Sequence, residues 1–362
     1  MNYQQEVVQS DSSSSIPAQT FSSLSSHEVQ WRERYDGLLV RGYQLRPRYR
    51  PNWKPSWIGT SLDVDCCEDF VDTIYTNVLD ATRLRDNQLV CMKVVSRDSE
   101  EFRIARMVSP SNHTRSPNNH CVPIIEVIPD PTNSSNQILV MPYLHPCNSP
   151  KFDSVEQVID FVKQTLEGLC FLHSQGVAHR DCWTTNIMMD AAVLYPDGHH
   201  PIKPWRTPDI SGSSKVLKRS HHPIKYYFID FGLSTYFEIG ESPYVLGAKC
   251  ADRTPPELSN EIPYNAFMLD VYILGHVFES ELQAFPGIEP LKSLAAAMMD
   301  KQPERRPTAE DALRIFYDIR HGLVTAGSRW RRPGNKDETA TEQVVSNLTA
   351  TFASWTGIKL RT

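Results

Sequence analysis

Two short strings constrain the fold of this chain more than any other feature. The first, HRDCWTTN at 179–186, carries a carboxylate at Asp181 and an amide five positions later at Asn186. The second, DFG at 230–232, follows the apolar stretch YYFI, so that Asp230 is predicted to lie at the end of a strand. Each string alone also fits a surface turn, whereas their succession along one chain favours a shared site.

These residue types suit the transfer of a phosphoryl group. That chemistry needs a carboxylate beside the acceptor hydroxyl, a carboxylate and an amide for metal ions, and a fixed cation near the phosphates. Lys93, in the predicted strand VCMK at 90–93, is the candidate cation. An exposed strand lysine is the alternative interpretation of Lys93. Together with the carboxylates and the amide of the two strings, however, Lys93 completes the group of side chains that phosphoryl transfer requires.

Bulk properties exclude several other classes of protein. The net charge of −6 argues against a nucleic-acid binder, which needs a basic surface. No apolar run approaches the roughly 18 residues of a membrane span, and the first residues lack the pattern of a signal peptide. The eight cysteines show no CxxC spacing, so that we expect reduced thiols and no zinc site. We therefore expect an intracellular monomer, cytoplasmic or nuclear, without nucleic-acid or membrane partners.

The first part of the chain changes composition near residue 28. Residues 1–27 are rich in Ser and Gln and are expected to be disordered. The stretch 41–57 (RGYQLRPRYRPNWKPSW) contains too many prolines for a regular helix and is expected to pack as an extended segment. Residues 327–362 form a polar tail with one expected helix around 341–354.

Apolar periodicity predicts the remaining elements. The longest is a helix over 154–173, where Ser154 and Gln157 form a capping-box pattern. The other predicted elements are two strands within 77–95, a helix at 98–108, a buried strand at 138–144, and helices at 267–283, 288–300 and 308–320.

A stretch of 43 residues, from 187 to 229, separates Asn186 from Asp230. Its part at 191–223 is rich in Pro, Gly, Ser and His, which is loop composition. A loop of this length is usually functional or disordered. We expect it to loop out at the surface without separating Asn186 from Asp230.

In this order, the strings VCMK, HRDCWTTN and DFG resemble those of the eukaryotic protein kinase superfamily, over about residues 75–320. The resemblance implies an α+β fold of two lobes. The small lobe, about 28–144, would hold an antiparallel sheet and one helix, and the large lobe, about 145–326, would be mainly helical. The aromatic and basic segment at 41–57 also resembles the corresponding segment of single-domain kinase-like proteins abundant in mushroom-forming fungi.

The resemblance implies a role for each residue of the two strings. Asp181 would orient the acceptor hydroxyl and take its proton. Asn186 and Asp230 would hold Mg²⁺ or Mn²⁺. Lys93 would contact the ATP phosphates and pair with Glu101, for which Glu100 is the alternative.

The stretch VMPYL at 140–144 resembles the segment that joins the two lobes. Met141 would then be the gatekeeper, and the backbone of Pro142 and Leu144 would face adenine; a plain buried strand is the alternative. The remaining matches would be structural or regulatory: His179, Arg180, Phe231, Gly232, Glu257 in TPPE, Asp270 in LDVYILG and Arg306 in ERRP. The last three disfavour a small-molecule phosphotransferase.

One departure from the family lies before Lys93. The family's glycine-rich loop approaches the phosphates closely, whereas DVDCCEDFVDTIYT at 63–76 is acidic and contains no glycine. Two functions therefore stay open: a kinase acting on protein hydroxyls, with Ser/Thr favoured over Tyr, or a pseudokinase that serves as a scaffold. Arg180 further suggests control by phosphorylation at Ser234, Thr235, Tyr236, Ser242 or Tyr244.

Overall fold

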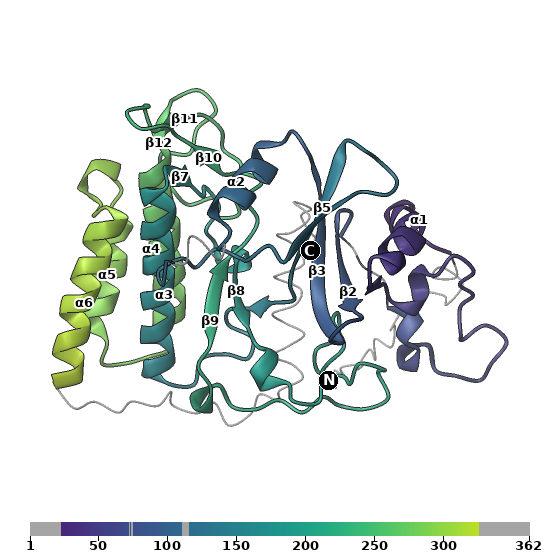
Figure 1. Ribbon diagram of the computed structural model, residues 1–362. Coiled ribbons are helices and arrows are strands. Elements are labelled where there is room, and N and C mark those ends of the chain that lie inside the picture. Colours follow the sequence, from purple (N-terminus) through teal and green to yellow (C-terminus); the bar gives the residue numbers. More distant parts are fainter. Residues whose placement is uncertain (1–22, 72, 74, 111–115, 326–362) are drawn as a thin grey trace, which may run out of the picture.

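The structure is a computed structural model that describes residues 23–325, apart from 72, 74 and 111–115 (Figure 1). It has a smaller lobe built on a sheet and a larger lobe built mainly of helices, which lie on opposite sides of the view in Figure 1. The predicted α+β architecture with two lobes is confirmed.

The small lobe contains a five-stranded antiparallel sheet. Its strands lie in the order β1-β2-β3-β5-β4, and β2 pairs with β3 so that Val78 lies opposite Lys93. The strands are β1 (Tyr43–Gln44), β2 (Val78–Arg83), β3 (Gln88–Ser96), β4 (Glu126–Pro129) and β5 (Asn136–Pro142). Strand alternation places Cys91 and Lys93 on the face that looks toward the large lobe, whereas Val90 and Met92 pack in the core of the opposite face.

A helix covers each face of this sheet. On the inner face lies α2 (Glu100–Val108), whose Ser99 caps the first turn by accepting from the backbone N–H of Phe102. On the outer face lies α1 (Ser26–Val40), whose buried Trp31 and Leu38 pack against the sheet. Figure 1 shows α1 on the side of the sheet away from the helical lobe. The prediction of one helix was therefore incomplete, and α1 begins within the stretch expected to be disordered.

The segment 41–57 packs against the small lobe, as predicted, through β1 and a 3₁₀ turn at Pro47–Tyr49. Two of its arginines are buried and paired with carboxylates. The Arg46 Nε lies 3.0 Å from an oxygen of Asp80, and the Arg48 Nε lies 2.5 Å from an oxygen of Glu28 on α1. These pairs attach the segment to β2 and to α1.

The large lobe is organised around α3 (Val155–Ser174). Its apolar side, including Phe161 and Leu169, is fully buried. Helix α4 (Ala266–Leu282) packs closely on α5 (Glu289–Met298) because Gly275 has no side chain: a Cβ there would lie 2.7 Å from that of Met298. The last helix is α6 (Ala309–Thr325). All four helices were predicted, with ends that differ by a few residues.

The remaining strands are short. They are β6 (His145–Pro146), β7 (Val177–Ala178), β8 (Ile187–Asp190), β9 (Lys225–Phe228), β10 (Thr235–Tyr236), β11 (Tyr244–Val245) and β12 (Tyr264–Asn265). The helix expected around 341–354 lies outside the described residues. None of the helices within the described residues is both long and apolar enough to cross a membrane.

Candidate active site

A pair of antiparallel strands brings the two sequence strings together. Ile187 of β8 lies opposite Phe228 of β9, and the Ile229 N–H donates to the carbonyl of Asn186 at 3.0 Å. Asn186 therefore enters β8 beside the point where Asp230 leaves β9. The strand pairing, rather than the length of the connection, places the amide next to the carboxylate.

The connection itself does not loop out freely, contrary to our expectation. Residues 191–223 contain little regular structure, yet Leu194, His199, His200 and Ile210 are buried. Long-range contacts with the rest of the molecule order this insertion, and local composition gives no sign of them.

Both side-chain oxygens of Asp181 accept hydrogen bonds. Its Oδ2 accepts from Asn186 Nδ2 at 2.8 Å, and its Oδ1 accepts from the backbone N–H of Ala251 at 2.6 Å. Burial raises the pKa of Asp181, and the nearby charge of Asp230 adds to this effect, whereas the Ala251 and Asn186 bonds oppose it only in part. Asp181 thus holds its proton more strongly than a free aspartate.

Lys93 is the central cation of the site. Its Nζ lies 2.5 Å from Glu101 Oε1 on α2 and 2.9 Å from Asp230 Oδ1. Burial opposes the charged form of Lys93, but the two carboxylates outweigh it and the pKa of Lys93 is raised. Burial likewise raises the pKa of Asp230, yet the charge of Lys93 overcomes this and leaves that pKa lowered. Lys93 and Asp230 are therefore a charged pair at neutral pH, with Glu101 rather than Glu100 as the helix partner.

Close packing holds Asp230 in place. Its Oδ1 accepts from the Gly232 N–H at 3.0 Å, and a Cβ on Gly232 would lie 3.0 Å from the same oxygen. The ring of Phe231 is buried 5.5 Å from that of His179. Asp230 itself has a φ of +60°, a conformation that costs an ordinary residue about 1–3 kcal/mol and that clusters at functional sites.

Asp270 braces the loop that carries Asp181. It is fully buried, and its two oxygens accept from the backbone N–H groups of His179 at 2.8 Å and Arg180 at 2.6 Å. A third bond comes from the ring of His173 at 3.0 Å. Because Arg180 has a φ of +64°, these bonds hold a strained turn immediately before Asp181.

The guanidinium of Arg180 contacts neutral groups from the segment after DFG. It donates to Thr235 Oγ1 at 3.2 Å, to the Leu246 carbonyl at 3.0 Å and to Tyr264 Oη at 3.3 Å. Thr235 is thus the candidate phosphorylation site in direct contact with Arg180. Ser234, by contrast, is buried and donates its hydroxyl to the His179 carbonyl. Control by phosphorylation stays a prediction.

Glu257 and Arg306 form the predicted pair in the large lobe. The Arg306 side chain is fully buried, and its Nη2 lies 2.9 Å from Glu257 Oε2. Arg306 also donates to the carbonyls of Met268 and Asp300 and lies 4.7 Å from the ring centre of Tyr272. These bonds tie the end of the segment 244–257 to α4.

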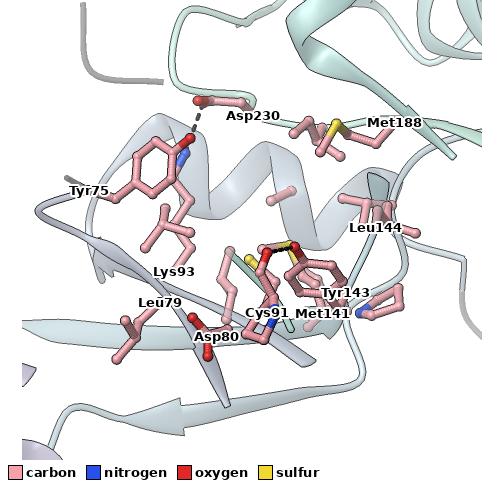
Figure 2. Close-up of a pocket in the computed structure, with 18 of the residues that line it drawn as sticks. Tyr75, Leu79, Asp80, Cys91, Lys93, Met141, Tyr143, Leu144, Met188 and Asp230 are labelled. Atoms are coloured by element: carbon pink, nitrogen blue, oxygen red, sulfur yellow. Dashed lines mark hydrogen bonds and ion pairs between the residues drawn. The ribbon is translucent and has the colours of Figure 1, made fainter. Parts of the chain in front are cut away.

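A largely apolar pocket of about 130 Å³ lies between the lobes, next to Lys93 and Asp230 (Figure 2). Met141, the expected gatekeeper, lines it together with Pro142 and Leu144, whose backbone was expected to face adenine. Other polar or aromatic residues that were not predicted also line the pocket: Thr73, Tyr75, Asp80, Cys91 and Tyr143. Strand alternation could have identified Cys91, since it lies two positions before Lys93 on β3.

Tyr75 belongs to the glycine-free segment before β2. Figure 2 shows its ring pointing toward Lys93 and Asp230, at the end of the pocket away from Leu144. In this structure, an aromatic side chain therefore lies where a glycine-rich loop would leave open space.

The donor atoms of the site suit a hard divalent cation. Asn186 uses its Nδ2 for Asp181, which leaves its Oδ1 for a metal, and Asp230 keeps Oδ2 beside the oxygen that faces Lys93. Mg²⁺ is typically held by one or two protein oxygens together with substrate phosphates and water. Within the described residues no group of three or more His, Cys, Asp or Glu side chains could hold a metal. The two-residue set fits Mg²⁺.

Comparison with known proteins agrees with this geometry. A family model of the protein kinase domain matches residues 74–286, more than half of the 362-residue chain. Mouse protein-tyrosine kinase 6 is 25% identical over 174 residues, which cover 43% of this chain and 33% of the mouse protein. The chain thus spans about a third of the length of this curated relative. The match over 74–286, together with the two-lobed fold and the Lys93–Glu101 pair, shows that the chain belongs to the protein kinase domain family.

Proposed function

We propose that this protein transfers the γ-phosphate of ATP to a hydroxyl of a protein substrate. The observation that carries the proposal is the position of Lys93, which contacts Glu101 and Asp230 at the same time. In protein kinases, both this lysine–glutamate pair and the metal-binding aspartate must be in place for phosphoryl transfer. Here both are present together with Asp181 and Asn186.

The pocket would hold the purine base between the sheet and the large lobe. Cys91 and Met141 on the sheet side and Met188 on β8 provide the apolar walls. The segment that joins the lobes, from Pro142 to Leu144, forms the inner edge. Lys93 would then contact the phosphates, whose negative charge Mg²⁺ on Asn186 and Asp230 would help to neutralise.

Asp181 would act on the acceptor hydroxyl. Its carboxylate is fixed by Asn186 and Ala251, so that little reorganisation is needed when a hydroxyl approaches. Its raised pKa makes it a better proton acceptor than a free aspartate, and such positioned proton transfer contributes about 10²- to 10⁴-fold to a rate. The hydroxyl must enter beside the Ala251 N–H, because that group already occupies one side of Oδ1.

A pseudokinase is the second candidate, and the pocket favours it. A volume of about 130 Å³ is below the roughly 300–1,000 Å³ of pockets that hold small molecules. Tyr75 lies near the expected position of the phosphates. Catalysis therefore requires the segment around Tyr75 to move, whereas a scaffold does not.

Phosphate transfer from ATP to generic protein acceptors, and to the chain itself, separates the two functions. The acceptors should present Ser, Thr and Tyr, with Mg²⁺ or Mn²⁺, and Lys93→Met serves as the control variant. The kinase proposal predicts transfer by the native chain and a loss of at least 100-fold in Lys93→Met. If the native chain and Lys93→Met both gave only background transfer, while ATP raised the Tm of the native chain, the result would support a pseudokinase that binds nucleotide.

A further inference from the structure

The insertion at 191–223 contacts both lobes and the segment between them. In Figure 1 the chain between β8 and β9 runs below the large lobe and reaches the region under β2 and β3. Its far end is fixed by Arg219, which is buried and donates to the carbonyls of Cys147 at 3.0 Å and Pro150 at 2.6 Å. Arg219 therefore attaches the C-terminal end of the insertion to the residues that follow the connecting segment.

A cluster of rings attaches the insertion to the connecting segment. The ring of His145 is stacked on Tyr195 with centres 4.8 Å apart, and its Nε2 lies 3.0 Å from that of His199. The His199 Nδ1 lies 3.1 Å from the carbonyl of His200, to which it can only donate, so that the His199 Nε2 accepts from His145. The hydroxyl of Tyr143 donates to the Pro201 carbonyl.

A chain of polar side-chain contacts attaches the insertion to the small lobe. The ring of His200 is fully buried, and its Nε2 lies 3.3 Å from Glu68 Oε1. Glu68 lies 3.6 Å from Arg46, which is bonded to Asp80 on β2. Asp80 is opposite Cys91 and lines the pocket. The insertion is thus linked by side chains to the sheet above the pocket.

Pro201 and Ile202 line the same pocket as Lys93 and Met141. We propose that Pro201 and Ile202 form the outer wall of the base-binding half of this pocket and that residues 199–202 tie the two lobes together. The proposal that Pro201 and Ile202 form a wall of the pocket, called the wall below, rests on the proposed function, because it takes the ligand to be the purine base of ATP. The proposal that residues 199–202 connect the two lobes, called the tie below, does not depend on any ligand.

Ile202→Ala tests the wall, with Val216→Ala as the matched control. Both variants shorten a β-branched side chain of the same insertion, but Val216 is 44% exposed and lies away from the pocket. Binding of ATP with Mg²⁺ would be measured by titration calorimetry. We expect Ile202→Ala to raise the Kd by about three- to tenfold, because apolar contact with the base is lost, and Val216→Ala to change it by less than about twofold.

Tyr143→Phe tests the tie without nucleotide. It removes only the hydroxyl that bonds Pro201, and Tyr244→Phe, at a site 58% exposed, is the control. Amide hydrogen exchange should become faster around 199–202 in Tyr143→Phe alone, since local opening becomes easier. Unchanged exchange there would overturn the tie.

The two measurements also separate this inference from the proposed function. If the native chain binds ATP and Ile202→Ala binds it as tightly as Val216→Ala does, the wall is overturned while the proposed function stands. If the native chain binds no ATP, both the proposed function and the wall are overturned. Faster exchange in Tyr143→Phe would then still support the tie.

Discussion

Replacing Glu28 with Gln tests how the unexpected helix α1 is held on the small lobe. Both side chains of the Glu28–Arg48 pair are 1% exposed, and the second Glu28 oxygen accepts from the N–H and hydroxyl of Ser25. Removing one partner of a buried pair costs about 3–5 kcal/mol, because the other charge is left unpaired. Arg48 would keep its bond to the Asp69 carbonyl and its contact with Trp53, so that we expect the lower end, about 3 kcal/mol.

Urea unfolding followed by tryptophan fluorescence measures this loss of stability, because Trp31 lies on α1 and Trp53 lies beside Arg48. With a slope of about 3 kcal/mol per M, the midpoint should fall by about 1 M urea. Glu33→Gln is the matched control, since Glu33 is exposed on the same helix and should change the free energy of unfolding by less than about 0.5 kcal/mol.

The pH dependence of the difference in free energy of unfolding between the native chain and Glu28→Gln provides a second check. Burial raises the pKa of Glu28, but the bonds from Arg48 and Ser25 outweigh burial and lower it overall. Its contribution to stability is therefore complete above the unfolded pKa of about 4.3 and is lost as the pH falls through the lower folded value. Equal midpoints for Glu28→Gln and Glu33→Gln at pH 7 would refute the role of the pair.

Three further predictions concern the site and the insertion. Because the pKa of Asp181 is raised, the transfer rate should fall on acidification at a pH above the roughly 3.9 of free aspartate; a pH–rate profile that is flat down to pH 4 would contradict this. Burial lowers the pKa of His145 and His199, so that the free energy of unfolding should decrease as the pH falls below the unfolded value of about 6.5; urea titrations between pH 7.5 and 5 should show a smaller decrease in His199→Gln. Asp270→Asn should leave the backbone N–H of His179 or Arg180 without an acceptor. It should therefore lower the free energy of unfolding by about 1–3 kcal/mol, measured by urea titration, and slow phosphate transfer, measured on the same sample.

The residues of the proposed active site could be located from the sequence because they lie in short strings. Asn186 and Asp230 lie at the ends of two strands that pair directly, so that the connection between them has no effect on their distance. Lys93 lies on a central strand whose alternation fixes the face of its side chain. The local sequence pattern was therefore sufficient to place these three residues in one site.

Helix α1 was missed because its buried side includes charged residues. Glu28 and Arg34 are buried in ion pairs with Arg48 and Asp130, so that the helix shows little apolar periodicity. The sequence did contain one signal, Ser25 followed three positions later by Glu28, which is a capping-box pattern.

The packing of the insertion could not be predicted from its composition. Its order depends on partners far away in the chain, such as Tyr143 for Pro201 and Glu68 for His200. The same holds for Asp80, since strand alternation indicates the face of its side chain but not the partner, Arg46, that makes its burial tolerable.

Comparing ATP affinity with phosphate transfer in Asp181→Asn tests the central claim most directly. In the proposed function, Asp181 acts on the acceptor hydroxyl, whereas Lys93, Asn186 and Asp230 would hold the nucleotide and metal. The variant should therefore bind ATP with Mg²⁺ within about threefold of the native chain, yet transfer phosphate at least 10²-fold more slowly. Equal transfer rates in the variant and the native chain would contradict the assignment of Asp181 and, with it, the proposed site.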